Sequence, residues 1–130
     1  MADPYTHKQL TDVKDSAPEF GFDQVMEARF AGRDLDAVRT GVSYERIKPG
    51  KRQAFGHNHD RVEEIYVVVR GAGRLKLDDE VIEVAELDAI RVAPEVTRCW
   101  EAGEDGLEIV AFGEHDDEDK GEVLMGWWSE

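Results

Sequence analysis

A series of short strand-like segments separated by turns fills the sequence from Gly41 onward and limits the fold most. Runs rich in apolar and β-branched residues occur at positions 42–48, 64–69, 74–77, 81–84, 89–92, 97–101 and 107–112. Turn-forming residues separate them at 49–50, 71–73, 78–79 and 104–106. No helical period joins the runs. The pattern predicts an all-β fold, either a barrel or a sandwich, built from antiparallel hairpins.

The segment before these strands has a different character. Residues 1–20 are polar and contain Pro4 and Pro18, which predicts an irregular arm. Apolar positions between Phe22 and Leu35 suit a short helix or an edge strand equally, and Gly32 interrupts both patterns. We therefore divide the chain into an N-terminal arm and lead-in at 1–36, a barrel core at 37–113 and a C-terminal part at 114–130.

The C-terminal part consists of an acidic loop followed by an apolar end. Residues 113–121 are rich in Asp and Glu, and residues 123–128 include Trp127 and Trp128. We expect this end to pack on the barrel as a closing strand or short helix. A contact between two protomers is the alternative for the same apolar surface.

The charge balance argues against several classes of partner. The chain has 30 acidic and 16 basic residues, a formal net charge of −14. Such a field repels nucleic acid and anionic membrane surfaces. Cys99 is the single cysteine, so no internal disulfide can form, and no stretch has the pattern of a signal peptide or a membrane helix. These features predict a cytoplasmic protein.

One group of residues is suited to metal binding. His57 and His59 are two positions apart, so in a strand both imidazoles would point to the same face. Glu64 opens the next predicted strand, and a hairpin could bring its carboxylate beside them. Two histidines and one carboxylate suit iron, manganese, nickel or zinc.

The same residues carry a resemblance to the cupin family. That family's first motif has a glycine, a His-x-His pair, a glutamate four or five positions later and a second glycine after six more residues. His57, His59, Glu64 and Gly71 match it, while Gly50 precedes His57 by one residue more than the motif has. The resemblance covers residues 41–113 and implies a jelly-roll β-barrel of two facing antiparallel sheets. It also implies a homodimer.

The family's second motif is only partly present, at residues 87–102. With Leu87-Asp88 aligned to the family's Gly-Asp pair, Arg98 stands where the third histidine ligand belongs. With Pro94 as the anchor, Cys99 takes that position, and a thiolate can bind zinc or iron. Strand alternation favours Arg98, because it shares a face with Trp100, which suits a barrel interior.

An inward Arg98 would bring a permanent positive charge and planar donors to the pocket. Such a group favours a carboxylate or phosphate ligand and disfavours a divalent cation. An internal ion pair with Glu64 is an equally open interpretation. Further candidates for the ligand pocket, chosen by strand alternation, are Tyr66, Tyr44, Arg46 and Trp100. His7 and His115 are expected to be exposed.

Three functional hypotheses follow. The first is a small-molecule-binding cupin with a degenerate metal site and a small polar or anionic ligand, with Arg98 as the anion anchor. The second is a metal-dependent cupin enzyme, an oxygenase or isomerase acting on a small acid or sugar through His57, His59 and Glu64. In the third the barrel is a dimerisation or scaffold unit, which an exposed Trp127 or Trp128 would favour.

Overall fold

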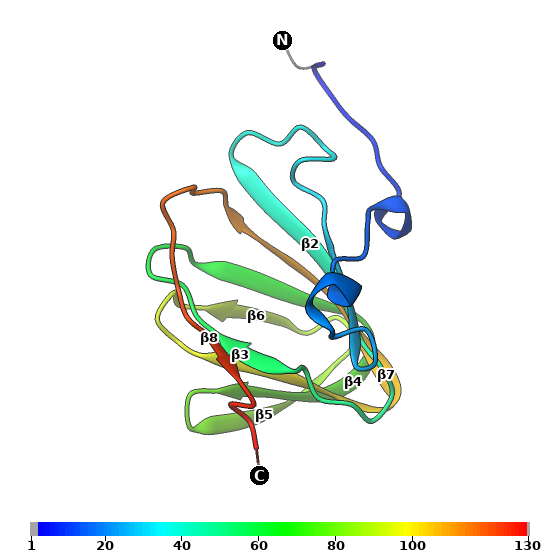
Figure 1. Ribbon diagram of the computed structural model, residues 1–130, viewed down its shortest axis with the longest axis vertical. Helices are drawn as coiled ribbons and strands as arrows, with labels where there is room; N and C mark the ends of the chain where they lie inside the picture. Colours follow the sequence, from blue (N-terminus) through cyan, green and yellow to red (C-terminus); the bar gives the residue numbers. More distant parts are fainter. Residues whose placement is uncertain (1–2, 130) are drawn as a thin grey trace.

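A computed structural model describes residues 3–129, so residues 1, 2 and 130 of the predicted arm and tail lie outside it. Nearly all regular structure is β-strand, as predicted (Figure 1). The elements in chain order are the 3-10 helices η1 (Leu10–Asp12) and η2 (Ala17–Phe20) and the strands β1 (Met26–Phe30), β2 (Thr40–Ile47), β3 (Phe55–His57), β4 (Glu64–Leu77), β5 (Glu80–Ala85), β6 (Ala89–Val92), β7 (Arg98–Glu114) and β8 (Val123–Met125).

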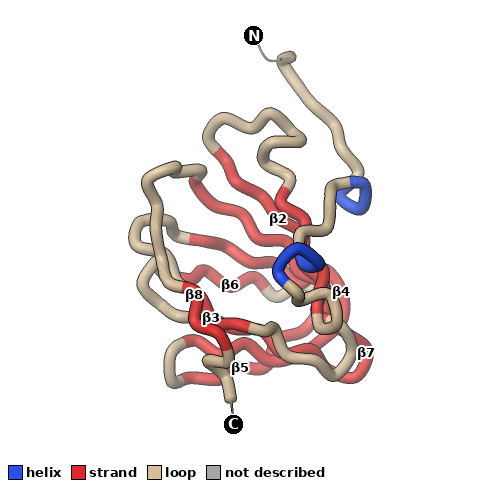
Figure 2. Tube along the Cα trace, in the orientation of Figure 1, coloured by secondary structure: helices blue, strands red, loops and turns tan. Residues whose placement is uncertain are grey.

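Two long antiparallel strands, β4 and β7, organise the sheet. They pair along their lengths, from Glu64 opposite Gly113 to Leu77 opposite Arg98. One end of β7 also pairs with β2, and its other end meets β3, so the sheet curls back on itself (Figure 2). β1 and β8 extend the order to β1-β2-β7-β3-β8. This curled antiparallel arrangement confirms the predicted all-β jelly-roll class.

Two of the predicted turns are wrong, because the strands bend there without ending. Residues 71–73 lie inside β4 and residues 104–106 inside β7. Register shifts between Val68 and Arg70 and between Gly71 and Gly73 mark the bend in β4. Gly71 has a φ of 86°, and a Cβ there would lie 2.1 Å from the backbone oxygen of Gly106. Glycine is required because the β4 and β7 backbones cross so closely there.

The ambiguous lead-in contains an edge strand. β1 pairs antiparallel with β2, with Met26 opposite Ile47 and Phe30 opposite Ser43. Ser16 and Asp15, just before η2, bond to the backbone of Ala28, which ties the N-terminal segment to this strand. The first part of the chain extends away from the barrel before reaching η1 (Figure 1). The lead-in therefore supplies one wall of the barrel opening.

The interior is apolar at the centre and is closed by the C-terminal segment. The core contains Leu75, Leu107, Ile109 and Trp100, each no more than 1% exposed. β8 pairs with β3, as the predicted closing strand would, and Trp128 is 4% exposed. The exposed tryptophan that would favour a scaffold role is therefore not found at position 128. No helix within residues 3–129 has the length and apolarity needed to cross a membrane.

Candidate functional site

Three predicted metal ligands meet at the open end of the barrel. One ligand atom from each of His57, His59 and Glu64 can be chosen so that all lie within 4.8 Å of one another. Glu64 Oε1 lies 3.1 Å from His59 Nε2 and 3.7 Å from His57 Nε2. Bonds of about 2.1 Å to one ion would separate neighbouring ligands by about 3 to 3.4 Å, so the donor set fits a divalent cation. We refer to these residues as the His-His-Glu group.

The local backbone differs from the predicted strand. β3 ends at His57, and His59 lies in the following loop, which the backbone N–H of His59 ties to Pro94 O at 2.8 Å. The two rings still approach each other, with centroids 5.3 Å apart and planes at 80°. The expectation that one strand carries both histidines was wrong, but the loop brings His59 to the same side of the barrel.

Hydrogen bonding keeps Glu64 ionised. Its Oε1 accepts a hydrogen bond from the Tyr66 hydroxyl at 2.7 Å and contacts His59 at 3.1 Å. Burial by itself raises the pKa of Glu64, but the interactions with His57, His59 and Tyr66 outweigh it and hold the pKa well below its ordinary value. An ionised carboxylate is the state that binds a cation.

Asp119 of the acidic loop orients His59. Its Oδ2 lies 2.6 Å from His59 Nδ1, and its Oδ1 accepts the backbone N–H groups of Arg61 and Val62. The interactions with Glu64 and Asp119 raise the pKa of His59. Asp119 accepts a hydrogen bond from Nδ1 and so turns Nε2 toward Glu64; Nε2 is the atom that would bind an ion once its own proton is lost. Sequence reasoning missed Asp119, since nothing local links it to a histidine 60 positions away.

His57 and Arg98 are neighbours across two strands, and each has side-chain nitrogens without a hydrogen-bond partner in the described chain. Arg98 lies directly opposite His57 across β3 and β7 and is completely buried. Burial lowers the pKa of His57, so this imidazole is neutral, and its Nδ1 has no hydrogen-bond partner among residues 3–129. Nη2 of Arg98 donates to Ala93 O, while Nε and Nη1 likewise lack partners in the described chain. The alternative ion pair between Arg98 and Glu64 is therefore not formed.

The remaining candidates for the ligand pocket separate into two groups. Tyr66 lines the space beside the His-His-Glu group, and the Trp100 ring packs edge-on against the Tyr66 ring in the core, with ring centroids 5.3 Å apart. Tyr44 and Arg46 lie on the other face of β2, where they bind Glu108 and Glu27. Alternation along β2 turns Glu45 inward in their place. The structure thus does not bring Tyr44 and Arg46 to the site.

Cys99 and the other histidines lie away from the His-His-Glu group. Cys99 points to the opposite side of β7 from Arg98, and its Sγ contacts Gln53 O at 3.5 Å. Burial raises the pKa of this thiol to about 12, so it is not a thiolate at neutral pH. His7 and His115 are exposed, as predicted. His115 pairs with Asp117 in the acidic loop.

A cavity of about 390 Å³ gives access to the group. All three candidate ligands line it, together with Tyr66 and Asp119, and it is bounded by residues 120–123. His59 and Glu64 also face a wider opening of about 620 Å³ toward the N-terminal segment. Arg98 lines neither space. Glu45, which sequence reasoning missed, does line the smaller one, and the inward positions of β2 were the signal for it.

Comparison with known proteins relates this architecture to solved structures. No protein-family model matches the chain, and no curated protein sequence is significantly similar to it. A cupin protein from Bacteroides fragilis aligns at 21% identity over 90% of this chain and 89% of its own, with a TM-score of 0.71. A polyketide cyclase from Streptomyces resistomycificus aligns at 18% identity over 96% and 87%, with a TM-score of 0.72.

A sugar phosphate isomerase of the cupin superfamily from Silicibacter pomeroyi is similar in the same way. It aligns at 15% identity over 89% of this chain and 80% of its own, with a TM-score of 0.71. Identities this low establish shared architecture and leave activity open. The curled sheet, the His-His-Glu group at its open end and these structural neighbours together identify the chain as a protein of the cupin fold.

Proposed function

We propose that this chain is a small-molecule-binding cupin in which His57, His59 and Glu64 hold a divalent metal ion with three protein ligands. The observation that carries the proposal is the convergence of their ligand atoms within 4.8 Å on the wall of an open cavity. The small molecule is polar or anionic. An ion bound there would act as a Lewis acid on an oxygen atom of that molecule.

The protonation states support this assignment. A metal ligand must be deprotonated, and burial keeps His57 neutral while the surrounding donors keep Glu64 charged. Asp119 would retain the Nδ1 proton of His59 and so fix its orientation. His59, whose pKa is raised by Glu64 and Asp119, would have to lose its Nε2 proton when an ion binds, so metal binding competes with a proton at this nitrogen. The donor set is then two imidazoles and one carboxylate, which is found with several first-row metals.

Arg98 makes the site degenerate and supports an anionic ligand. It replaces a fourth protein ligand in the aligned second motif, so a bound ion would keep positions open for a small molecule. No acidic side chain among residues 3–129 pairs with its guanidinium. Because Arg98 is buried and lines neither cavity, we assign its influence on the ligand to its charge and not to a direct hydrogen bond.

Calorimetric titration of acetate tests the proposal. Acetate should bind at least about tenfold more tightly to zinc-loaded protein than to chelator-treated protein, because the carboxylate would occupy an open metal position. Arg98→Met should weaken binding to the loaded protein, since the nearby positive charge is lost. Equal affinity with and without metal would contradict the proposed role of the ion.

A second candidate is an enzyme that uses the same residues. The solved sugar phosphate isomerase of similar architecture and the open positions beside a three-ligand site favour a metal-dependent isomerase or oxygenase acting on a small acid or sugar. Turnover of a sugar phosphate or an aromatic acid by metal-loaded protein, lost in Glu64→Gln, would favour this candidate. A homodimer remains a proposal that light scattering can test.

A further inference from the structure

A second cavity of about 360 Å³ adjoins the site and has a different character. It lies between η2, β1, β2, β3 and β8, and apart from Ser16 and Glu45 every residue that lines it is apolar. It shares four lining residues with the cavity of the His-His-Glu group: Phe30, Glu45, Phe55 and Val123. The two spaces therefore meet along a common wall, and a volume of this size is within the range of small-molecule sites.

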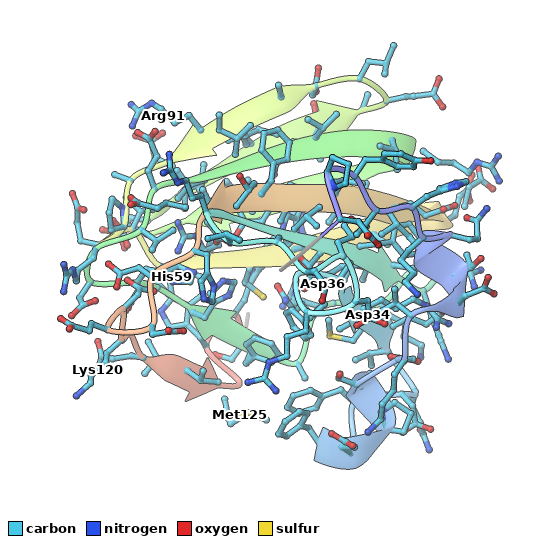
Figure 3. All side chains as sticks on the ribbon, turned by 90° about the horizontal axis from the view of Figure 1, so that it is seen from above. Asp34, Asp36, His59, Arg91, Lys120 and Met125 are labelled. Carbon is cyan, nitrogen blue, oxygen red and sulfur yellow. The ribbon has the colours of Figure 1, made fainter. Side chains whose placement is uncertain are left out.

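Aromatic contacts run from this apolar cavity to the metal ligands. The ring centroid of Phe22 lies 5.1 Å from that of Phe55, which lies 6.0 Å from that of His57. Met125 of β8 and His59 appear on the same side of the molecule in Figure 3, each lining one of the two spaces. A molecule bound at the His-His-Glu group could thus extend along a continuous surface.

The rim of the apolar cavity is unusually exposed. Phe20 and Met125 are 66% and 63% exposed, and Phe30 and Val123 are similarly open to solvent. All four line this one cavity. Large apolar side chains gathered around a hollow mark a place where another molecule binds.

Glu45 lies where the two spaces meet and lacks a partner. Glu45 as a whole is 8% exposed and lines both cavities, yet no hydrogen bond or ion pair of its side chain is found within residues 3–129. A buried carboxyl without a partner is destabilising unless something else satisfies it. Burial raises the pKa of Glu45 to about 7, so a protonated carboxyl able to donate a hydrogen bond is well populated at neutral pH.

We propose that the ligand is amphipathic, with a flat apolar body in the cavity beside η2 and β8 and a polar end at the His-His-Glu group. Glu45 donates a hydrogen bond to a ligand oxygen where the two parts join. This inference rests on the proposed function and adds the chemical class of the ligand. The apolar body of the ligand would cover the exposed side chains around this cavity. A second copy of the chain is the competing occupant of the same surface.

Two probes that differ only in their apolar body test this directly. Equilibrium dialysis of zinc-loaded protein should give at least about tenfold tighter binding of 2-naphthoate than of acetate, because the naphthyl group leaves water. The variant Phe20→Ser/Met125→Ser should lose that advantage. The matched variant Val38→Ser/Val69→Ser, which removes exposed apolar side chains elsewhere, should keep it.

Glu45 is tested with the same probe. Glu45→Leu should weaken 2-naphthoate binding about tenfold, and Glu45→Gln, which still donates an N–H, should restore most of it. Circular dichroism checks that each variant is folded. Equal weakening by Leu and Gln would overturn the hydrogen-bonding role.

Other outcomes separate this inference from the proposed function. Equal affinities of the two probes for zinc-loaded protein would overturn the amphipathic ligand while leaving the metal site and its binding of acetate standing. No binding of either probe to protein that holds zinc would overturn both proposals. If Phe20→Ser/Met125→Ser converts a dimer to a monomer without changing 2-naphthoate affinity, the surface is an interface between copies and the inference fails. Naphthoate binding that depends on Phe20 and Met125 in protein unable to hold metal would instead refute only the proposed metal site.

Discussion

The two adjoining spaces of the barrel differ in how their charged groups are satisfied. At the His-His-Glu group, Glu64 contacts Tyr66 and His59, and Asp119 in turn holds His59. In the apolar cavity, Glu45 is the one charged residue and lacks any such contact within the described chain. The first space is organised before anything binds, whereas the second contains a buried group whose partner would have to come from outside the chain.

Replacing Glu45 should change stability most. Burial, with a smaller contribution from the charge of Glu64, raises the pKa of Glu45 from its ordinary value of 4.5 to about 7. Below about pH 4 the carboxyl is neutral in both folded and unfolded protein, so its ionisation does not change the free energy of unfolding. Between these pKa values the unfolded chain ionises first, so stability falls as pH rises, by up to about 3 kcal/mol above pH 7.

Glu45→Gln should remove this loss. Urea unfolding should show the variant more stable than the unmodified protein by about 3 kcal/mol at about pH 8, with little difference near pH 4. If the difference in free energy of unfolding between the two proteins does not vary with pH, ionisation of buried Glu45 is not what destabilises the protein.

Asp119→Asn should weaken metal binding by about 10- to 100-fold, because His59 loses the carboxylate that orients it. Competition with a chromophoric chelator measures this. Asp117→Asn is the matched control, since Asp117 is in the same acidic loop but pairs with the exposed His115. A similar loss in both variants would indicate that the net charge of the loop matters and not the contact with His59.

Arg98 provides an unsatisfied charge beside the well-organised site. Arg98→Met should raise the free energy of unfolding by about 1 to 3 kcal/mol, since two guanidinium nitrogens are buried without partners. Arg74→Met is the comparison on the outer face, where Arg74 pairs with partly exposed Glu101, and it should lower stability by less than about 1 kcal/mol. Destabilisation by Arg98→Met would show that the guanidinium supports the fold.

The sequence predicted the features that depend on local spacing. The turns and alternating residues indicated an antiparallel barrel, and the short separation of His57, His59 and Glu64 indicated that their side chains meet. The bends in β4 and β7 were not predicted, because glycine-rich turn signals and glycine at a strand crossing are identical in sequence.

Features assembled from distant segments could not be predicted in this way. Asp119 reaches His59 only because the acidic loop folds back over the barrel opening. The apolar cavity combines residues from η2, β1, β3 and β8, whose proximity depends on the complete topology. The position of Glu45 could have been predicted, since alternation along the strand places it on the same inward side as Ile47. The neighbouring Tyr44 and Arg46 were chosen as site candidates instead.

Metal content after reconstitution tests the central claim most directly. Protein freed of metal, incubated with zinc and desalted should retain about one ion per chain by elemental analysis, since three ligands converge on one point. His59→Ala should retain far less, and His115→Ala, which removes an exposed histidine outside the group, should match the unmodified protein. Equal metal content in all three proteins, or none in the unmodified one, would contradict the assignment of His57, His59 and Glu64 as a metal site.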